Sequence, residues 1–105
     1  MSDLVFFLSN DVHPVELEPR AIDYAEIKRR LEDGFVFIKF LDTKGGTELG
    51  INVNVMLTDS SKVDFVNKKG TLVLVGDCEL DYKKIRCSIT VDMEKLKGEG
   101  SVKVL

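Results

Sequence analysis

The sequence holds few of the side chains on which enzymes rely. Its 105 residues include no tryptophan, one histidine, His13, and two cysteines, Cys78 and Cys87. It contains no Gly-x-Ser-x-Gly nucleophile elbow, no phosphate-binding loop and no dinucleotide-binding fingerprint. We therefore expect a protein that is not an enzyme, with no catalytic residues, no cofactor and no metal ion.

The apolar run near the N-terminus is short. It extends over five residues, from Leu4 to Leu8, follows an acidic residue and has no basic flank. A secretory signal needs about 7–15 apolar residues after positive charge, and a membrane span needs about 20. We therefore expect no membrane contact and a cytoplasmic location, where cysteines stay reduced. The run itself is predicted to form a strand.

An excess of positive charge is absent as well. Eighteen acidic residues against fifteen basic ones give a net charge of −3, so no global field attracts the chain to phosphate backbones. Lysines do gather beside Tyr82 at Lys83–Lys84, and again at Lys68–Lys69. The expected strand order places these clusters at opposite ends of the sheet. We interpret both as solubilising loops and do not expect nucleic acid as a partner; binding of single strands is the alternative.

Proline is scarce, and both prolines fall in one polar connection. Pro14 and Pro19 lie within residues 9–21 and bias the residues before them away from helix. We expect this connection to be extended or turning.

The segment that follows has helical periodicity. Asp23 and, three residues later, Glu26 resemble a capping box, and Gly34 supplies a stop. These signals predict one amphipathic helix over about residues 23–33. Its apolar stripe comprises Ile22, just before the cap, and Tyr24, Ile27 and Leu31.

From residue 35 onward the apolar period changes to two, which is typical of strands. Segments 35–43 and 47–58 flank a glycine-containing loop that we interpret as a hairpin, with anion binding assisted by Lys44 as the alternative. We predict a register that places Ile38 opposite Ile51. The apolar face of the second segment then comprises Leu49, Ile51, Val53, Val55 and Leu57.

The first of these segments is apolar on both faces. Phe35, Phe37 and Leu41 occupy the face opposite Ile38, so we expect that face to be covered too. Residues 59–70 form a polar connection whose pattern does not distinguish a short helix from an irregular edge strand or a loop. Three more alternating segments follow, at residues 71–80, 84–92 and 97–105.

The two cysteines lie on neighbouring predicted strands. A turn at Asp81–Lys84 places Cys78 opposite Cys87 on the apolar face, and pairs Glu79 with Arg86 on the other. We interpret the cysteines as reduced core thiols with raised pKa values; a disulfide or redox pair is the alternative. Their spacing does not suit a zinc site.

The last predicted hairpin follows the same logic. It places Cys87 opposite Val102 and Val91 opposite Gly98. Glycines opposite bulky residues suggest space for a neighbouring element or a bend in the sheet.

His13 lies near several acidic residues in the proline-containing connection. We interpret it as part of a polar surface loop, with a metal site or a general base as the alternative.

These segments predict a single α+β domain over residues 1–105. We expect a largely antiparallel meander of five to six strands with one packed amphipathic helix, as an open sheet or as a partly closed barrel with the helix at one mouth. The aromatic bulk of the core is assigned to Phe6, Phe7, Phe35, Phe37 and Phe40.

The expected function is inferred mainly from the absence of catalytic motifs in the sequence. We expect a small soluble interaction module (a subunit, adaptor, inhibitor or regulator) that contacts another protein or a second copy of itself. The C-terminal strand, ending at Leu105, is the predicted edge for that contact. The alternative is a domain that binds a small apolar ligand in a pocket between helix and sheet.

Overall fold

The chain folds as an α+β protein with an antiparallel sheet, which confirms the predicted class. The computed structural model describes residues 2–21 and 23–105, so Ile22 of the predicted stripe lies outside the described residues. The described elements, in chain order, are α1 (Asp3–Ser9), β1 (His13–Leu17), α2 (Tyr24–Asp33), β2 (Phe35–Phe40), β3 (Thr47–Val53), β4 (Val63–Asp64), β5 (Lys69–Leu80), β6 (Lys83–Asp92) and β7 (Lys97–Val104).

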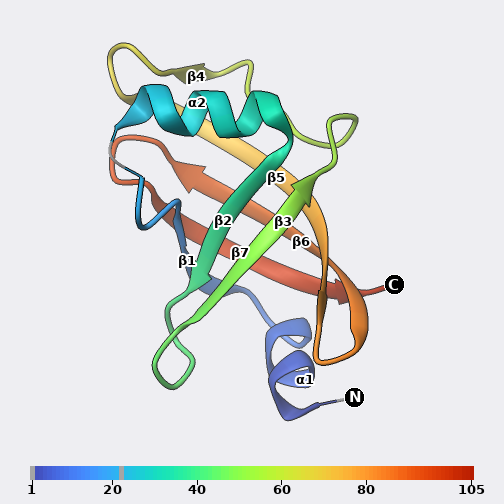
Figure 1. Ribbon diagram of the computed structural model, residues 1–105. Helices are drawn as coiled ribbons and strands as arrows, with labels where there is room; N and C mark the ends of the chain where they lie inside the picture. The colour runs from blue at the N-terminus through green and yellow to red at the C-terminus, as the bar shows by residue number, and fades with distance from the viewer. Residues whose placement is uncertain (1, 22) are drawn as a thin grey trace.

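Six of the strands close into a barrel. Their order is β3-β2-β1-β7-β6-β5, and the short β4 pairs with β5 outside it. Closure comes from two pairs between β3 and β5, Asn52 with Asp77 and Val53 with Gly76. Figure 1 shows α2 lying across one end of the barrel and α1 at the other. Of the two predicted forms, an open sheet and a partly closed barrel, the structure has the barrel.

The core is built from the inward-facing residues of the barrel strands and one side of each helix. Leu8 of α1 and Ile27 of α2 are both buried, so each helix closes one end of the barrel. Each such side chain contributes about 1.5–3 kcal/mol when it leaves water. Neither helix of the described chain is long and apolar enough to cross a membrane.

The predicted helix is confirmed as α2. The side chain of Asp23 accepts a hydrogen bond from the backbone N–H of Glu26 at 2.9 Å, as an N-cap should. Gly34 ends the helix in a left-handed conformation with φ 85°, which glycine adopts without steric cost.

The strand predicted over Leu4–Leu8 is wrong, because this run forms α1. The Ser2 hydroxyl oxygen accepts a hydrogen bond from the N–H of Val5 at 3.1 Å and caps the helix. Val5 and Leu8, three residues apart, are buried on its inner side. The run carries no polar residue that would separate a period of 3.6 from a period of two.

The proline-containing connection includes a strand of the barrel. Residues 13–17 are extended, as expected, but they form β1, which pairs with β2 on one side and β7 on the other. Pro14 is tolerated there because its side chain is exposed and its carbonyl accepts a hydrogen bond from Leu41 N–H at 3.0 Å. The undecided stretch 59–70 contains the two-residue strand β4.

The β6–β7 register is confirmed. Cys87 faces Val102, and Val91 faces Gly98. A Cβ added at Gly98 would lie 1.8 Å from the carbonyl oxygen of Thr90, so the sheet bends too tightly here for any side chain.

The two other predicted registers are wrong by two residues. In β2–β3, Ile38 pairs with Leu49. In β5–β6, Cys78 pairs with Ile85, because the turn has only two residues, Asp81 and Tyr82, both with positive φ. A slip of two residues keeps every side chain on its predicted face.

The charged pair of that hairpin changes with the register. Glu79 lies opposite Lys84, not Arg86. The Arg86 guanidinium instead donates two hydrogen bonds to the Asp77 carboxylate, at 2.8 and 3.1 Å. These bonds lower the pKa of Asp77 below its ordinary value.

The predicted aromatic core is mostly wrong. Phe40 is fully buried, but Phe6, Phe7, Phe35 and Phe37 are all exposed. The face of β2 that was expected to be covered is open to solvent, with the Phe35 and Phe37 rings packed edge to face at 5.3 Å.

The C-terminal strand is not a free edge along its whole length. Residues 97–100 of β7 pair with β1 as well as with β6, and in the described pairings residues 101–104 pair with β6 alone. Barrel closure therefore removes half of the edge that the sequence predicted for a partner.

Candidate functional site

After β3 the chain forms a firmly held turn at residues 54–58. The Asn54 side chain accepts a hydrogen bond from Leu57 N–H at 3.1 Å, which closes the turn. The N–H of Asn54 donates to the Val75 carbonyl at 2.7 Å, and the Thr58 hydroxyl bonds both the N–H and the carbonyl of Val75 at 3.1 Å. The backbone of this turn is therefore anchored to β5.

The same turn presents its apolar side chains to solvent. Val55 is 76% exposed, Met56 is 92% exposed and Leu57 is 50% exposed, and Val66, close to β4, is 88% exposed. The prediction that Val55 and Leu57 lie on a buried face is wrong, because β3 ends at Val53. We call Val55, Met56 and Leu57 the apolar turn surface; Val66 lies apart from it, in the turn between β4 and β5.

A cleft of about 300 Å³ adjoins this surface, between α2 and the chain that follows β3. Its apolar walls include Leu31 of α2, Val53 and Phe65, and Val55 belongs to both the cleft and the apolar turn surface. Lys28 and Glu32, 4.0 Å apart on α2, add one charge of each sign. The full lining is Lys28, Leu31, Glu32, Val53, Val55, Thr58, Ser60 and Phe65.

The chain matches no protein-family model and no curated protein.

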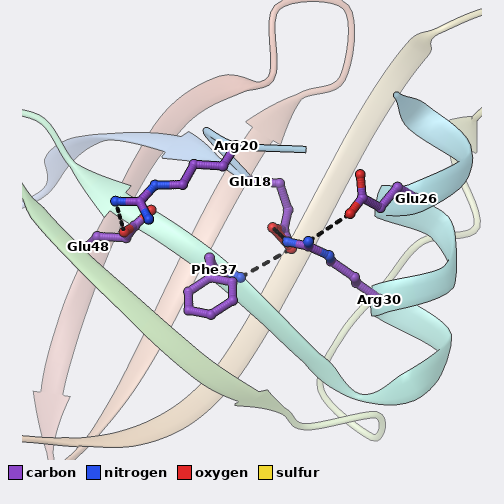
Figure 2. Close-up of polar contacts among 6 residues, drawn as sticks. All are labelled: Glu18, Arg20, Glu26, Arg30, Phe37 and Glu48. Carbon is purple, nitrogen blue, oxygen red and sulfur yellow. Dashed lines mark hydrogen bonds and ion pairs between the residues drawn. The ribbon is translucent and has the colours of Figure 1, made fainter. Parts of the chain in front are cut away.

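A polar cluster fixes α2, which forms one wall of the cleft, to the barrel. As Figure 2 shows, the Arg30 guanidinium lies between Glu18 and Glu26 and donates to them at 2.5 and 2.7 Å. The Glu18 side chain is fully buried. Its hydrogen bond is the largest influence that raises the pKa of Arg30 further above its ordinary value.

The cluster also contains an aromatic contact and a second ion pair. Arg30 lies over the Phe37 ring, 5.9 Å from its centroid. Arg20, mostly exposed, pairs with Glu48 at 3.1 Å. Within the described chain every buried side-chain nitrogen and oxygen has a hydrogen-bond partner. We therefore assign this cluster a positioning role for α2.

His13 is buried rather than exposed in a polar loop, so that prediction is wrong. Its Nδ1 lies 2.8 Å from the Asp42 carboxylate, and its Nε2 lies 2.9 Å from the Phe7 carbonyl oxygen. Both ring nitrogens are therefore engaged in internal contacts. The Phe7 ring packs on the imidazole at 4.5 Å, so His13 joins α1 to the β2–β3 loop.

The contacts of His13 do not favour the metal alternative. Within residues 2–21 and 23–105, no three His, Cys, Asp or Glu side chains gather in a way that could hold a metal ion. The imidazole instead uses both nitrogens for internal hydrogen bonds.

The cysteines share one face of the β5–β6 hairpin, and both are free thiols. Cys87 is buried, and a hydrogen bond to Cys78, together with burial, raises its pKa as predicted. Cys78 is only partly buried, and the same hydrogen bond lowers its pKa, which is opposite to the prediction.

The lysine clusters lie at opposite ends of β5, as expected, but mostly within strands rather than loops. Lys83–Lys84 begin β6 after the tight turn, and at the other end Lys68 directly precedes Lys69, the first residue of β5. Lys68 also packs over the Tyr24 ring, 5.6 Å from its centroid. The loop that contains Lys44 connects β2 to β3 as the predicted hairpin.

Sequence reasoning missed the apolar turn surface. Alternation continues through residue 57 and is typical of a strand, although the chain leaves the barrel after residue 53. The available signal was Asn54, since asparagine favours turns in which its side chain bonds the backbone.

Proposed function

We propose that the protein is a non-catalytic interaction module that binds another protein through the apolar turn surface. The observation that carries this proposal is the combination of an anchored backbone at residues 54–58 with Val55, Met56 and Leu57 projecting into solvent. A cluster of exposed apolar side chains on a folded protein typically marks an interaction site. We further propose a cytoplasmic location, in which both cysteines would stay reduced.

The anchored turn favours tight binding. Association costs about 0.5–1.5 kcal/mol for each flexible side chain that it immobilises, and a preformed backbone avoids further ordering costs. Burial of Val55 and Met56 by a partner would regain about 1.5–3 kcal/mol for each side chain. These two residues are therefore the expected energetic centre of the interface.

The test is quantitative affinity purification with the wild-type protein and two variants. Val55→Lys combined with Met56→Lys changes only exposed side chains, so its stability should stay within about 0.5 kcal/mol of wild type. The matched control is Tyr82→Lys, at the exposed tip of the β5–β6 hairpin. A partner should be retained by the control and lost from the double variant.

Recovery of the same proteins with the wild type, the double variant and the control variant would overturn the proposal. Sedimentation of the purified chain shows whether the partner is a second copy, which should then dissociate in the double variant only.

The cleft favours a second candidate, a small apolar ligand held between α2 and the sheet. Its volume of about 300 Å³ reaches the lower limit of ordinary ligand pockets. Titration with an apolar probe such as indole should shift the methyl resonances of Leu31 and Val53 before any others. Equal shifts at the distant methyls of Val102 and Ile89 would contradict a site in the cleft.

A further inference from the structure

The two cysteines are neighbours on one face of the β5–β6 hairpin. Cys78 of β5 pairs with Ile85, and Cys87 of β6 pairs with Gly76, so the cysteines are diagonal neighbours on adjacent strands. Both side chains point to the same face of the hairpin, because Cys78 lies two residues from Gly76, the residue that pairs with Cys87. The two thiols are close enough for each to shift the pKa of the other.

The surroundings of the two thiols differ. Cys87 lies in the middle of β6, between Gly76 of β5 and Val102 of β7, and is fully buried. Cys78 follows Asp77, the last residue of β5 that pairs with β3. Beyond that point β5 loses its neighbour on one side, which leaves the Cys78 side chain partly open to solvent.

This asymmetry separates the roles of the two thiols. The hydrogen bond from Cys87 lowers the pKa of Cys78, and a thiolate is the reactive form of cysteine. The neighbouring Cys78 and burial raise the pKa of Cys87, so Cys87 is the less reactive of the two thiols. An accessible thiolate beside a second, buried thiol is the arrangement found in redox-sensing cysteine pairs.

We propose that Cys78 and Cys87 form a redox-active dithiol that a hydroperoxide converts reversibly to an intramolecular disulfide. In the first step the Cys78 thiolate attacks the distal peroxide oxygen, the O–O bond breaks, and the leaving group departs as water or an alcohol after taking up a proton. The product is a sulfenic acid at Cys78.

In the second step the Cys87 sulfur attacks the Cys78 sulfur, gives up its proton and displaces the hydroxyl group as water. The pair loses two electrons and two protons, and the peroxide gains them.

The strand geometry favours reversibility. Diagonal neighbours in an antiparallel sheet are about 7–8 Å apart at Cα, slightly beyond the usual span of a disulfide. Closure therefore requires movement of one strand, and among the described strand pairings the end of β5 from Cys78 to Leu80 pairs with β6 alone. A disulfide formed under such strain is readily reduced by thiols.

The decisive experiment treats the wild-type protein with hydrogen peroxide and maps its peptides by mass spectrometry. We expect one peptide pair joined through Cys78 and Cys87, which dithiothreitol separates again. In Cys87→Ser, Cys78 should instead accumulate as a sulfenic acid that dimedone traps. In Cys78→Ser, Cys87 should stay unmodified in the folded protein. An absence of the joined pair, or joining between separate molecules, would overturn the proposal.

A measurement on the folded wild-type protein does not depend on any variant. Iodoacetamide should alkylate Cys78 at least about tenfold faster than Cys87. Cys87→Ser retains a hydrogen-bond donor and Cys87→Ala does not, so alkylation of Cys78 should be slower in the alanine variant. Equal rates at Cys78 and Cys87 in the wild-type protein would contradict the assigned roles. The proposal is independent of the apolar turn surface.

Discussion

The carboxylate of Glu18 replaces a strand carbonyl beside Phe37. The N–H of Glu18 donates to the Phe37 carbonyl at 2.8 Å, which continues the β1–β2 ladder by one residue. Glu18 then turns the chain away with φ 46°, so its own carbonyl no longer faces β2. Its side chain accepts the hydrogen bond from Phe37 N–H instead, at 3.2 Å. One residue therefore ends β1 and also holds Arg30 of α2.

Replacement of Glu18 should destabilise the protein. Glu18→Ala leaves the N–H of Phe37 without its acceptor, and an unsatisfied buried group costs about 1–3 kcal/mol. Glu18→Gln retains an acceptor oxygen and should lose less. Urea denaturation measures both, with Glu79→Ala on the exposed face of β5 as the control. Equal stability of Glu18→Ala and the control would contradict the assigned role.

Loss of the His13 hydrogen bonds should loosen α1 selectively. His13→Phe preserves a ring against Phe7 but removes both ring nitrogens, so the Phe7 carbonyl and the Asp42 carboxylate lose their partner. We expect destabilisation of about 1–3 kcal/mol. Hydrogen exchange of the α1 amides should accelerate more than that of β6. Asp42→Asn, which retains an acceptor, is the milder control; uniform acceleration across the barrel would argue against a local role.

Asp77 should contribute to acid sensitivity. The hydrogen bonds from Arg86 hold its folded-state pKa below the ordinary value of 3.8. The pair therefore stabilises the fold fully above pH 3.8, and this contribution disappears as the pH falls through the lower folded-state value. Asp77→Asn should be less stable than wild type at neutral pH and approach it near pH 2. Urea midpoints across this range test it, with Glu79→Gln as the control; a constant difference would contradict the assignment.

The sequence was sufficient to predict the structure where the local pattern and the tertiary contacts favour the same conformation. Asp23 and Gly34 mark both ends of α2 because each acts within a few residues of itself. The β6–β7 register follows from unbroken alternation together with Gly98, which tolerates no other residue opposite Val91. Such signals need no knowledge of distant partners.

The features that the sequence did not predict depend on distant contacts. His13 becomes a buried residue only because Asp42, at the end of β2, supplies a carboxylate beside it. The candidate site was missed for a similar reason, since Val55 continues an alternating pattern after β3 has left the barrel. Periodicity reports which residues share a face, and it does not report where a strand stops.

The two-residue turn of the β5–β6 hairpin decides the register of its strands. Two-residue turns with positive φ at both positions favour Asn-Gly or Asp-Gly, but here Asp81 is followed by Tyr82, at φ 66°.

A left-handed conformation costs a non-glycine residue about 1–2 kcal/mol, and glycine loses about 0.5–1 kcal/mol of backbone entropy relative to alanine. Because Tyr82 is 96% exposed, its replacement removes no packing. Tyr82→Gly should therefore raise the free energy of unfolding by up to about 1 kcal/mol. Tyr82→Lys retains the strained conformation and should leave stability unchanged. Thermal and urea unfolding of the two variants should separate them, and a glycine variant no more stable than the lysine variant would show that the turn is not strained.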